Sequence, residues 1–519
     1  MTAYDQALYP SYTHAQTHPD QLATKAALFG LTPAPVDSCR MLELGCGDAT
    51  NLASIALGLP ESQFVGIDLA STAIARGREM TLALGLENVS LHAGSVLEIG
   101  PDYGQFDYIL AHGLYSWVPA EVREKILAIC QANLAPHGVA YVSYDARPGA
   151  HLKSMLREMM VFHTKGINDP KERVHQGIAL IKFLAESQTK NEAYRRYLEG
   201  ELAHLLQRDD NNVFHDELAE VNESFTFSQF CDHASQHGLQ YLAESDYLQM
   251  QDRNFAPSVR QTLRQLGKNR IAREQYLDFL SFRRFRQTLL CHAGLPLHFG
   301  MKPETLSRFH VSCAARPVSP EPDLRSDAPE KFTGDQDSNM EVCLPLAKAV
   351  LATLAEAWPR ALPFLDLMAQ GCARLGRAPV ESPADAEALA LFELFLESYA
   401  PGLAKLHLFP PKFAPRAGEH PVASPLARWQ ARTSQQLANL CHAPVVLENA
   451  SGRHLLMLLD GSRNRSALLR QMRAHLEAER HSRLAQGVTS LDPIPSDEVL
   501  AGNLENSLDV FARCALLVA

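Results

Sequence analysis

The stretch that decides the fold is Met41–Asn51, which reads MLELGCGDATN. An apolar strand ending at Leu44 runs into Gly45-Cys46-Gly47, and a helical pattern begins at Thr50. Glycines permit a tight turn and the close approach of a ligand, and the N–H groups of the helix N-terminus face that ligand. The next predicted strand ends in Asp68, whose carboxylate is placed to accept hydrogen bonds from ribose hydroxyls. The pattern therefore predicts a site for a cofactor that contains adenosine.

The glycine spacing bears on which cofactor this is. Nicotinamide enzymes share the layout but continue it as GxGxxG, whereas the third glycine position here is Thr50. The missing glycine, together with Glu43 two residues before Gly45, favours S-adenosylmethionine (SAM), whose amino-acid end presents an ammonium rather than phosphates. A hydride-transfer enzyme remains the alternative, as does a plain tight turn with Asp68 at a solvated strand end.

Outward from this motif, the first ~150 residues alternate short apolar runs with helical patterns, which is typical of βαβ units. The predicted strands are Arg40–Leu44, Gln63–Ile67, Val89–Ala93, Phe106–Ala111 and Gly138–Tyr144. The predicted helices are Thr50–Leu57, Thr72–Leu84 and Ala120–Leu134. The fold class is therefore α/β, with a Rossmann-like, doubly wound sheet over residues 1–150.

Further along the chain the apolar spacing becomes helical, and residues 151–224 are predicted to be a helical insertion. Residues 225–313 return to the same sheet, because Phe225–Tyr247 fits a helix followed by a strand, and Pro257–His292 is predicted to be helical. Arg283, Arg284 and Arg286 are expected to form a solvated or salt-bridged face there, rather than a site for an anionic partner.

The last part of the chain begins after residues 314–340, which are rich in proline and polar residues and are predicted to be a linker. Residues 341–519 are predicted to be a mostly helical C-terminal domain. Strands are expected at Lys405–Phe409, Val445–Leu447 and His454–Leu459. Leu458–Met472 fits a strand, a turn and a helix, which indicates a winged-helix-like unit.

Composition narrows the function. The chain has 519 residues, enough for three or four domains, and a net charge of −11, which disfavours a nucleic-acid partner. Ten scattered cysteines without a CxxC pair suggest neither a zinc site nor disulfides, so no metal is expected. The N-terminal segment lacks the basic and apolar regions of a signal peptide, and no apolar window approaches ~18 residues. We expect a cytoplasmic enzyme without membrane insertion.

Candidate site residues follow from strand ends, because ligands of open α/β sheets lie over the carboxyl ends of the strands. The expected cofactor-binding residues are Glu43, Gly45, Cys46, Gly47, Asp68, Leu69, Ser95, Val96 and His112. Ser95 is equally well explained as a loop cap. Tyr144 and Asp145 follow the fifth strand and are the catalytic candidates, with an ordinary turn as the alternative. Tyr115 and Trp117 are expected to line the acceptor channel, or simply to pack.

Several stretches carry a resemblance to a known family. They are Met41–Asn51, Tyr9–Leu31, Phe106–Pro119, Asn133–Gly149, Phe214–Glu223, Phe285–Gly294 and the LLDGSRNRSAL that begins at Leu458. The chain resembles the class I SAM-dependent methyltransferases, and more narrowly the bacterial ones that carry a methyltransferase regulatory domain, including the rickettsial protein lysine methyltransferases. This resemblance implies SAM as cofactor, a lysine side chain of a protein as substrate, and regulatory helices within residues 225–313.

The sequence departs from that family at two places. Ala49 stands where the family usually has glycine, and Asp145-Ala146-Arg147 stands where it usually has Asn-Thr-Tyr. Because the second change lies where the substrate is expected, two alternatives stay open. One is a small-molecule or natural-product methyltransferase, and the other is a non-catalytic SAM-binding scaffold.

The helical insertion offers a further expectation. Its apolar stripes are formed by Leu152, Met155, Met159, Ile178, Ile181 and Leu184. Helices of this size need another surface to cover such stripes, and a two-fold dimer is the commonest symmetric solution. The sequence therefore predicts an interaction element, most simply a homodimer interface.

Overall fold

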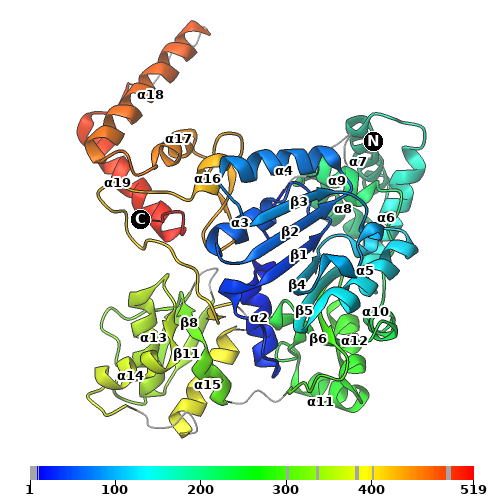
Figure 1. Cartoon of the computed structure of the whole chain (residues 1–519), viewed down its shortest axis with the longest axis horizontal. Helices are drawn as coiled ribbons and strands as arrows, with labels where there is room; N and C mark the ends of the chain where they lie inside the picture. Colours follow the sequence, from blue (N-terminus) through cyan, green and yellow to red (C-terminus); the bar gives the residue numbers. More distant parts are fainter. Residues whose placement is uncertain are drawn as a thin grey trace. The chain divides into compact units, whose positions relative to one another are not determined.

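A seven-stranded sheet organises the part of the chain that carries the glycine motif, in the order β3-β2-β1-β4-β5-β7-β6 (Figure 1). Its strands are β1 Arg40–Leu44, β2 Gln63–Asp68, β3 Val89–Ala93, β4 Phe106–Ala111, β5 Leu134–Asp145, β6 Leu239–Glu244 and β7 Phe285–His292. Strands β1 to β5 pair in parallel, and β7 is antiparallel to both of its neighbours. The five predicted strands are confirmed, and β5 begins at Leu134 rather than at Gly138.

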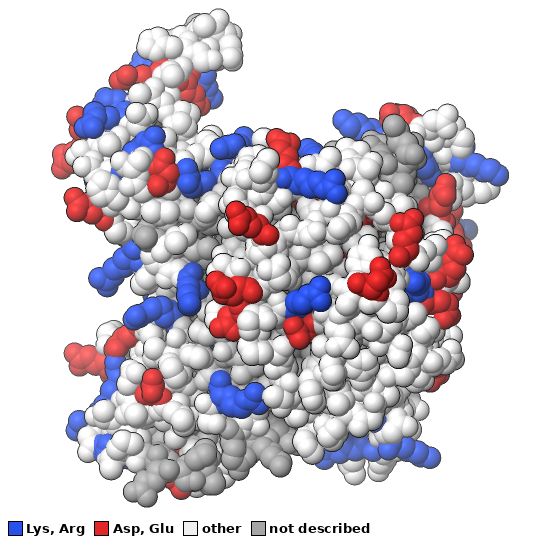
Figure 2. Space-filling view, viewed as in Figure 1, with Lys and Arg blue, Asp and Glu red and all other residues white. Residues whose placement is uncertain are grey.

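The computed structural model describes residue 9 and residues 11–299, 303–334, 338–379, 385–399, 402–486 and 493–518. The chain divides into two compact units. The sheet unit comprises Met1–Ser11, Lys25–Leu52 and Glu61–Gly300, and the C-terminal unit comprises Tyr12–Thr24, Ala53–Pro60 and Met301–Ala519. Within the described ranges, each helix is too short or too polar to span a bilayer. Figure 2 shows basic and acidic side chains interspersed over the face that it draws.

Helices connect the parallel strands as the predicted βαβ pattern requires. They are α3 Thr50–Gly58, α4 Ser71–Ala83 and α5 Ala120–Asn133, while α2 Pro19–Leu28 precedes the sheet. Helix α4 packs on β2 and β3, and α5 packs on β4 and β5. The core between α5 and the sheet is apolar, and Ile109, Ile126 and Val142 in it are fully buried. Apolar runs in buried parallel strands produce this core.

The helical insertion contains α6 Ala150–His163, α7 Pro170–Glu186, α8 Glu192–Leu206 and α9 Asp210–Glu217. Asp169 and Asn191 cap the N-termini of α7 and α8. These helices have a core of their own, which includes Met160, Val174 and Ile181. Met159, Ile178 and Leu184, three of the residues expected to face a second copy, are partly buried against this core. Most of the predicted stripe is thus covered inside the insertion.

The chain then re-enters the sheet, as predicted, through α10 Phe227–Gln236 and β6, followed by α11 Pro257–Leu266, α12 Arg270–Ser281 and β7. The prediction of a helix as far as His292 is wrong, because Phe285–His292 forms β7. This strand lies between β5 and β6 and buries residues on both faces, so the alternation that marks a strand is lost. The expected ion pairing is present, because Arg286 contacts Glu244, Glu274 and Asp278. The expected face is wrong, because Arg286 lies on β7 and is fully buried.

The C-terminal unit contains short strands and many helices. One three-stranded sheet pairs β8 His310–Cys313 with β12 Leu362–Pro363 and β13 Ala404–His407, and another pairs β10 Glu330–Thr333 with β9 Arg316–Pro317 and β11 Asn339–Val342. The helices α13 Pro345–Ala357, α14 Phe364–Arg374 and α15 Ala386–Tyr399 accompany them. Residues 314–340, predicted to be a linker, thus contribute to a sheet, and Phe332 within them is fully buried.

The end of this unit comprises α16 Pro425–Gln430, β14 Gln436–Ala438, β15 Pro444–Val446, α17 Ala450–Leu458, α18 Arg465–Ala485 and α19 Asp497–Arg513. The expected strands near Lys405–Phe409 and Val445–Leu447 are confirmed as β13 and β15. The strand expected at His454–Leu459 is wrong, because this segment lies in α17 and the turn after it. Asn449 caps that helix through the N–H groups of Ser451 and Gly452, and the capped apolar run becomes helical.

Candidate functional site

The glycine turn follows β1 and is tied to the end of β2. Gly45 and Gly47 have φ of 73° and 56°, in the left-handed region that favours glycine. The N–H groups of Gly45 and Cys46 donate to the carbonyl of Ile67 at 2.8 and 3.2 Å. A Cβ added at Gly47 would have no atom within 4 Å, so this side of the turn is open to a ligand. Burial raises the pKa of the Cys46 thiol well above its usual range, which leaves it protonated.

Asp68 braces this turn from the end of β2. Its Oδ2 accepts a hydrogen bond from the N–H of Gly47 at 2.9 Å, and its Oδ1 accepts one from the N–H of Ala70 at 2.7 Å. Leu69, beside it, is 61% exposed. The carboxylate is therefore held in a fixed orientation next to the open glycine turn.

Glu43 lies on β1 below the turn and is only 5% exposed. Its Oε1 accepts a hydrogen bond from Nδ2 of Asn51 at 3.0 Å, whereas its buried Oε2 has no partner among the described residues. Burial raises the pKa of this carboxyl to about 8, although the bond from Asn51 lowers it. A buried oxygen without a donor is costly, so this site fits a ligand that brings an ammonium or another donor.

The remaining cofactor candidates follow β3 and β4. Ser95 caps the short turn Val96–Glu98 by accepting a hydrogen bond from the N–H of Leu97, so its predicted capping role is confirmed. Nδ1 of His112 lies 3.0 Å from the Tyr141 hydroxyl. Because β1 to β4 are parallel and adjacent, their carboxyl ends share one edge. The structure thus brings Glu43, the glycine turn, Asp68, Ser95, Val96 and His112 to that edge.

A second group of side chains surrounds Asp145 at the end of β5. Its Oδ2 accepts hydrogen bonds from Nδ2 of Asn222 at 3.0 Å and from Nζ of Lys153 at 3.4 Å. The Lys153 ammonium also lies 5.1 Å from the centre of the Trp117 ring, a cation–π arrangement. The buried Nε1 of Trp117 has no acceptor among the described residues. A carboxylate and an aromatic face therefore already enclose one amino group here.

Tyr144 and Tyr115, in contrast, are not brought to this group. Neighbouring residues of a strand face opposite sides, so Tyr144 points away from Asp145 into the core, where its ring stacks on Phe230 at 4.2 Å between centroids. Tyr144 is fully buried, and Tyr115 is 1% exposed with its hydroxyl 2.5 Å from Nδ1 of His233. Neither hydroxyl is available to an external amine in this arrangement.

Three residues of these sites are absent from the sequence prediction. Asn51 is the second residue of α3, and this position in a predicted helix does not mark it as a partner of Glu43. Asn222 lies within a stretch that resembles the family, but only the fold shows that it reaches Asp145. Lys153 lies eight residues beyond Asp145 at the start of α6, and no sequence rule marks it as a partner of Trp117.

The fold and this edge define a class of protein. A glycine turn after β1, an acid at the end of β2 and a seven-stranded sheet with one antiparallel strand characterise the class I methyltransferases. Family models agree: a methyltransferase domain matches residues 35–209, a predicted methyltransferase regulatory domain matches residues 209–292, and the C-terminal winged helix domain of PKMT matches residues 419–516. The winged-helix-like unit predicted from the sequence is thereby confirmed.

Individual relatives extend the match to nearly the whole chain. The uncharacterized protein RP789 of Rickettsia prowazekii is 32% identical over 484 residues, covering 91% of this chain and 86% of the relative. RP028 of the same organism is 36% identical over 241 residues, 46% of this chain and 96% of that protein. The solved structure of PKMT2 from Rickettsia typhi superposes with a TM-score of 0.85 at 29% identity, covering 98% of this chain and 100% of PKMT2. PKMT2 in complex with AdoHcy gives 0.84 at 28% identity, with the same coverage.

This chain therefore belongs to the family of SAM-dependent methyltransferases that combine a methyltransferase regulatory domain with the PKMT winged-helix domain. The regulatory domain contributes β6 and β7 to the sheet, so it completes the fold of the catalytic domain.

Proposed function

We propose that this chain methylates lysine side chains of a protein substrate, with SAM as the methyl donor. The observation that carries the proposal is the superposition on PKMT2 from Rickettsia typhi over 98% of this chain and 100% of that one, including the complex with AdoHcy. Because the match includes the insertion and the C-terminal unit, it goes well beyond the shared methyltransferase sheet, which also serves small-molecule acceptors.

The residues at the sheet edge fit SAM. When bound, SAM supplies a methyl group activated by a sulfonium. In our proposal the unpartnered Oε2 of Glu43 accepts a hydrogen bond from the ligand ammonium, and Asp68 accepts hydrogen bonds from the ribose hydroxyls. The open side of Gly47 admits the ligand close to the backbone. Ser95, Val96 and Leu69 complete the adenosine side, with Cys46 and Gly45 in the turn and His112 nearer the acceptor.

Asp145 and Trp117 are the proposed acceptor residues. The substrate amine must be neutral to attack, and methyl transfer forms an N–C bond as the C–S bond breaks, after which the nitrogen loses a proton. Asp145 accepts a hydrogen bond from the amine and orients it, while the Trp117 face stabilises the positive charge that develops on nitrogen. Tyr144 acts as a buried support of this edge, and Tyr115 takes no part in it because its hydroxyl is bound to His233.

The deciding experiment measures which molecules of a lysate receive a labelled methyl group. Purified enzyme is incubated with methyl-labelled SAM and a lysate of its host, and label is measured in protein and in small molecules separately, with mass spectrometry to locate methyl-lysine. Asp68→Ala is the matched inactive enzyme, and Glu61→Gln, at an exposed surface position, is the control for substitution itself. Label that enters lysine only with active enzyme is expected. Label confined to small molecules would reject the substrate assignment, and absence of transfer to any fraction would reject the enzymatic one.

We also propose that the insertion mediates self-association. The contact is made by exposed apolar residues of the insertion and not by the predicted apolar stripes, most of which are covered within it. Phe162 on α6 is 84% exposed, Phe183 on α7 is 63% exposed and Leu206 on α8 is 65% exposed. Large apolar side chains exposed to this degree are candidates for an interaction surface. Light scattering at micromolar concentration should give a dimer mass that falls in Phe183→Ser, whereas a monomer mass for the wild type would reject the proposal.

A further inference from the structure

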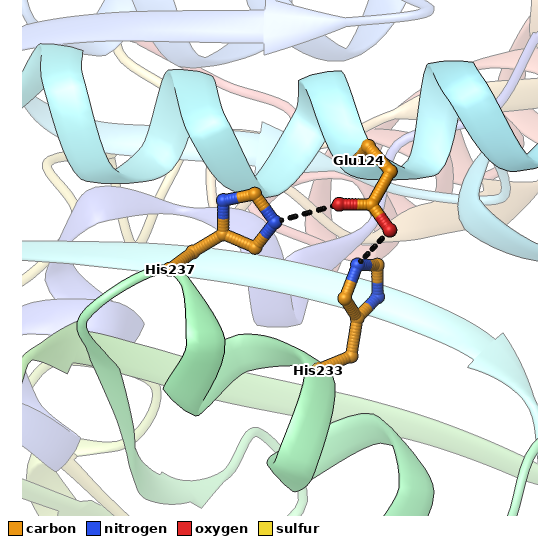
Figure 3. Close-up of side chains that lie close together, drawn as sticks. All are labelled: Glu124, His233 and His237. Carbon is orange, nitrogen blue, oxygen red and sulfur yellow. Dashed lines mark hydrogen bonds and ion pairs between the residues drawn. The ribbon is translucent and has the colours of Figure 1, made fainter.

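Two histidines and a glutamate that belong to neither group described above meet on the sheet unit. Glu124 comes from α5, His233 from α10, and His237 directly follows the end of α10. Figure 3 shows the two imidazole rings converging on the carboxylate. Nε2 of His233 lies 2.9 Å from Oε1 of Glu124, and Nε2 of His237 lies 2.9 Å from Oε2.

The local sequence explains why the two histidines share a face. Residues four apart on a helix lie one turn above each other, and His233 and His237 have this spacing. The start of α10 is fixed by a capping box between Thr226 and Gln229. Both rings are mostly buried, with 18% and 20% of the side chain exposed, whereas Glu124 is 60% exposed. A rigid histidine pair therefore faces a carboxylate that can still adjust its position.

These three groups have the composition and the spacing of a metal site. Two imidazoles and one carboxylate form a common ligand set for Zn²⁺, with bond lengths of about 2.0–2.2 Å. One donor atom from each residue lies within 4.8 Å of the others. Ligands of a tetrahedral ion lie about 3.4 Å apart, so side-chain adjustments of about 1 Å suffice.

Tyr115 also favours a metal site, through its contact with the other ring nitrogen of His233. Its hydroxyl lies 2.5 Å from Nδ1 of His233, the nitrogen that faces away from Glu124. Histidines that bind metals usually make a hydrogen bond through the other ring nitrogen, which fixes the tautomer and the ring orientation. A tyrosine hydroxyl can accept that bond from an Nδ1–H as readily as donate to the bare nitrogen. Buried Nε2 of His233 makes no hydrogen bond of good geometry despite its proximity to Glu124.

Solvent can supply the fourth ligand. Glu124 and His233 line an open pocket whose other walls include Arg147, Glu223 and Asp232. Arg147 belongs to the segment where this sequence departs from the family pattern, so this pocket is not implied by the resemblance.

We propose that Glu124, His233 and His237 bind a divalent transition-metal ion of the Zn²⁺ class, with water in the fourth position. The ion would join α5, within the methyltransferase-domain match, to α10, within the regulatory-domain match. Metal binding thus stabilises the docking of the regulatory segment on the catalytic sheet. The cysteine pattern could not reveal this site, because none of its ligands is a cysteine and Glu124 lies far from the histidines in sequence.

The test uses the untagged full-length protein after dialysis against a chelator. Calorimetric titration with ZnCl₂ should show one site, and Glu124→Gln should bind at least tenfold more weakly. Glu121→Gln, at an exposed position of the same helix, is the matched control and should bind as the wild type does. Tyr115→Phe removes only the hydroxyl and should weaken binding about tenfold. Because Glu124 is exposed, its substitution is not expected to unfold the protein, and circular dichroism checks this.

Cobalt gives an independent readout. Co²⁺ bound by imidazole and carboxylate gives visible d–d bands without thiolate charge-transfer absorption, which separates this site from binding by cysteines such as the exposed Cys343. Loss of those bands in His233→Gln and His237→Gln supports the proposal. Absence of stoichiometric binding in the wild type, equal affinities of Glu124→Gln and Glu121→Gln, or a thiolate spectrum would each overturn it.

Discussion

Replacing Glu43 by glutamine isolates one carboxyl group whose ionisation the fold opposes. The glutamine has the same shape and can still accept the hydrogen bond from Asn51 through its Oε1. In the folded protein burial raises the pKa of Glu43 to about 8, compared with an ordinary value of 4.5. The folded state therefore binds more protons than the unfolded state between these values, and the free energy of unfolding falls as pH rises through that window.

The size of the effect follows from the two pKa values. At about 1.4 kcal/mol per pKa unit, the cost of ionising Glu43 in the folded protein is about 5 kcal/mol, fully felt above pH 8. Urea denaturation of wild type and Glu43→Gln from pH 5 to pH 9 measures it. We expect the wild type to lose several kcal/mol more than the variant over this range. Glu61→Gln, an exposed position, should follow the wild type.

The same carboxyl links cofactor binding to proton release. With a pKa of about 8, roughly nine-tenths of the Glu43 side chains are protonated at pH 7. An ammonium beside Oε2 lowers that pKa, so binding of SAM should release up to about 0.9 proton. Calorimetry in buffers of different ionisation enthalpy counts these protons, and the count should fall to near zero in Glu43→Gln. Equal proton counts in variant and wild type, together with parallel pH–stability curves, would refute the reasoning.

Three further outcomes test other parts of the structure. Asp145→Asn should lower kcat about 10- to 100-fold through the loss of a charge-assisted hydrogen bond, with the affinity for S-adenosylhomocysteine unchanged by calorimetry; a matching loss of affinity would place Asp145 at the cofactor instead. Arg286→Met should destabilise the protein by about 3–5 kcal/mol in urea, because three buried carboxylates lose their partner, and a smaller effect than that of an exposed arginine would contradict this. Burial lowers the pKa of His18 from 6.5 to about 4, so between these values the unfolded state binds one more proton than the folded state, and the free energy of unfolding falls as pH drops. His18→Asn should therefore flatten the pH–stability curve between pH 6.5 and 4. An unchanged slope in the variant would contradict this prediction.

The fold was predictable where local sequence and tertiary role agree. Strands β1, β2 and β4 are short, largely buried apolar runs, and a parallel sheet covered on both sides requires such runs. The same rule fails at Phe285–His292, because the buried polar residues Arg286 and Thr288 interrupt the apolar run. Their partners Glu244 and Asp278 lie on other segments. It fails again at His454–Leu459, where periodicity cannot separate a short apolar strand from a helix and only the Asn449 cap decides.

The candidate site also has a part that the sequence could predict and a part that it could not. Each cofactor candidate lies at or just beyond the carboxyl end of a strand, so parallel topology alone brings them to one edge. The acceptor group depends on which face of β5 meets the core, and the sequence SYD does not say whether Tyr144 or Asp145 points inward. Burial of Tyr144 against Phe230, which lies in α10 of the regulatory domain, settles that choice. Contacts between distant segments therefore decide which of the two side chains can take the proposed acceptor role.

Lys153 sets the charge beside Asp145 and Trp117, the proposed acceptor residues. Burial lowers its pKa, but the charges of Glu217, Asp145 and Asp216 together raise it above the ordinary value, so Lys153 stays protonated. A protonated amine is no nucleophile, so we expect a substrate lysine rather than Lys153 to be the methyl acceptor. A substrate lysine that enters beside it meets a like charge, which favours the neutral, reactive amine. Lys153→Met should accordingly move the acid limb of the pH–rate profile to higher pH, and a profile that does not move would assign Lys153 a purely structural role.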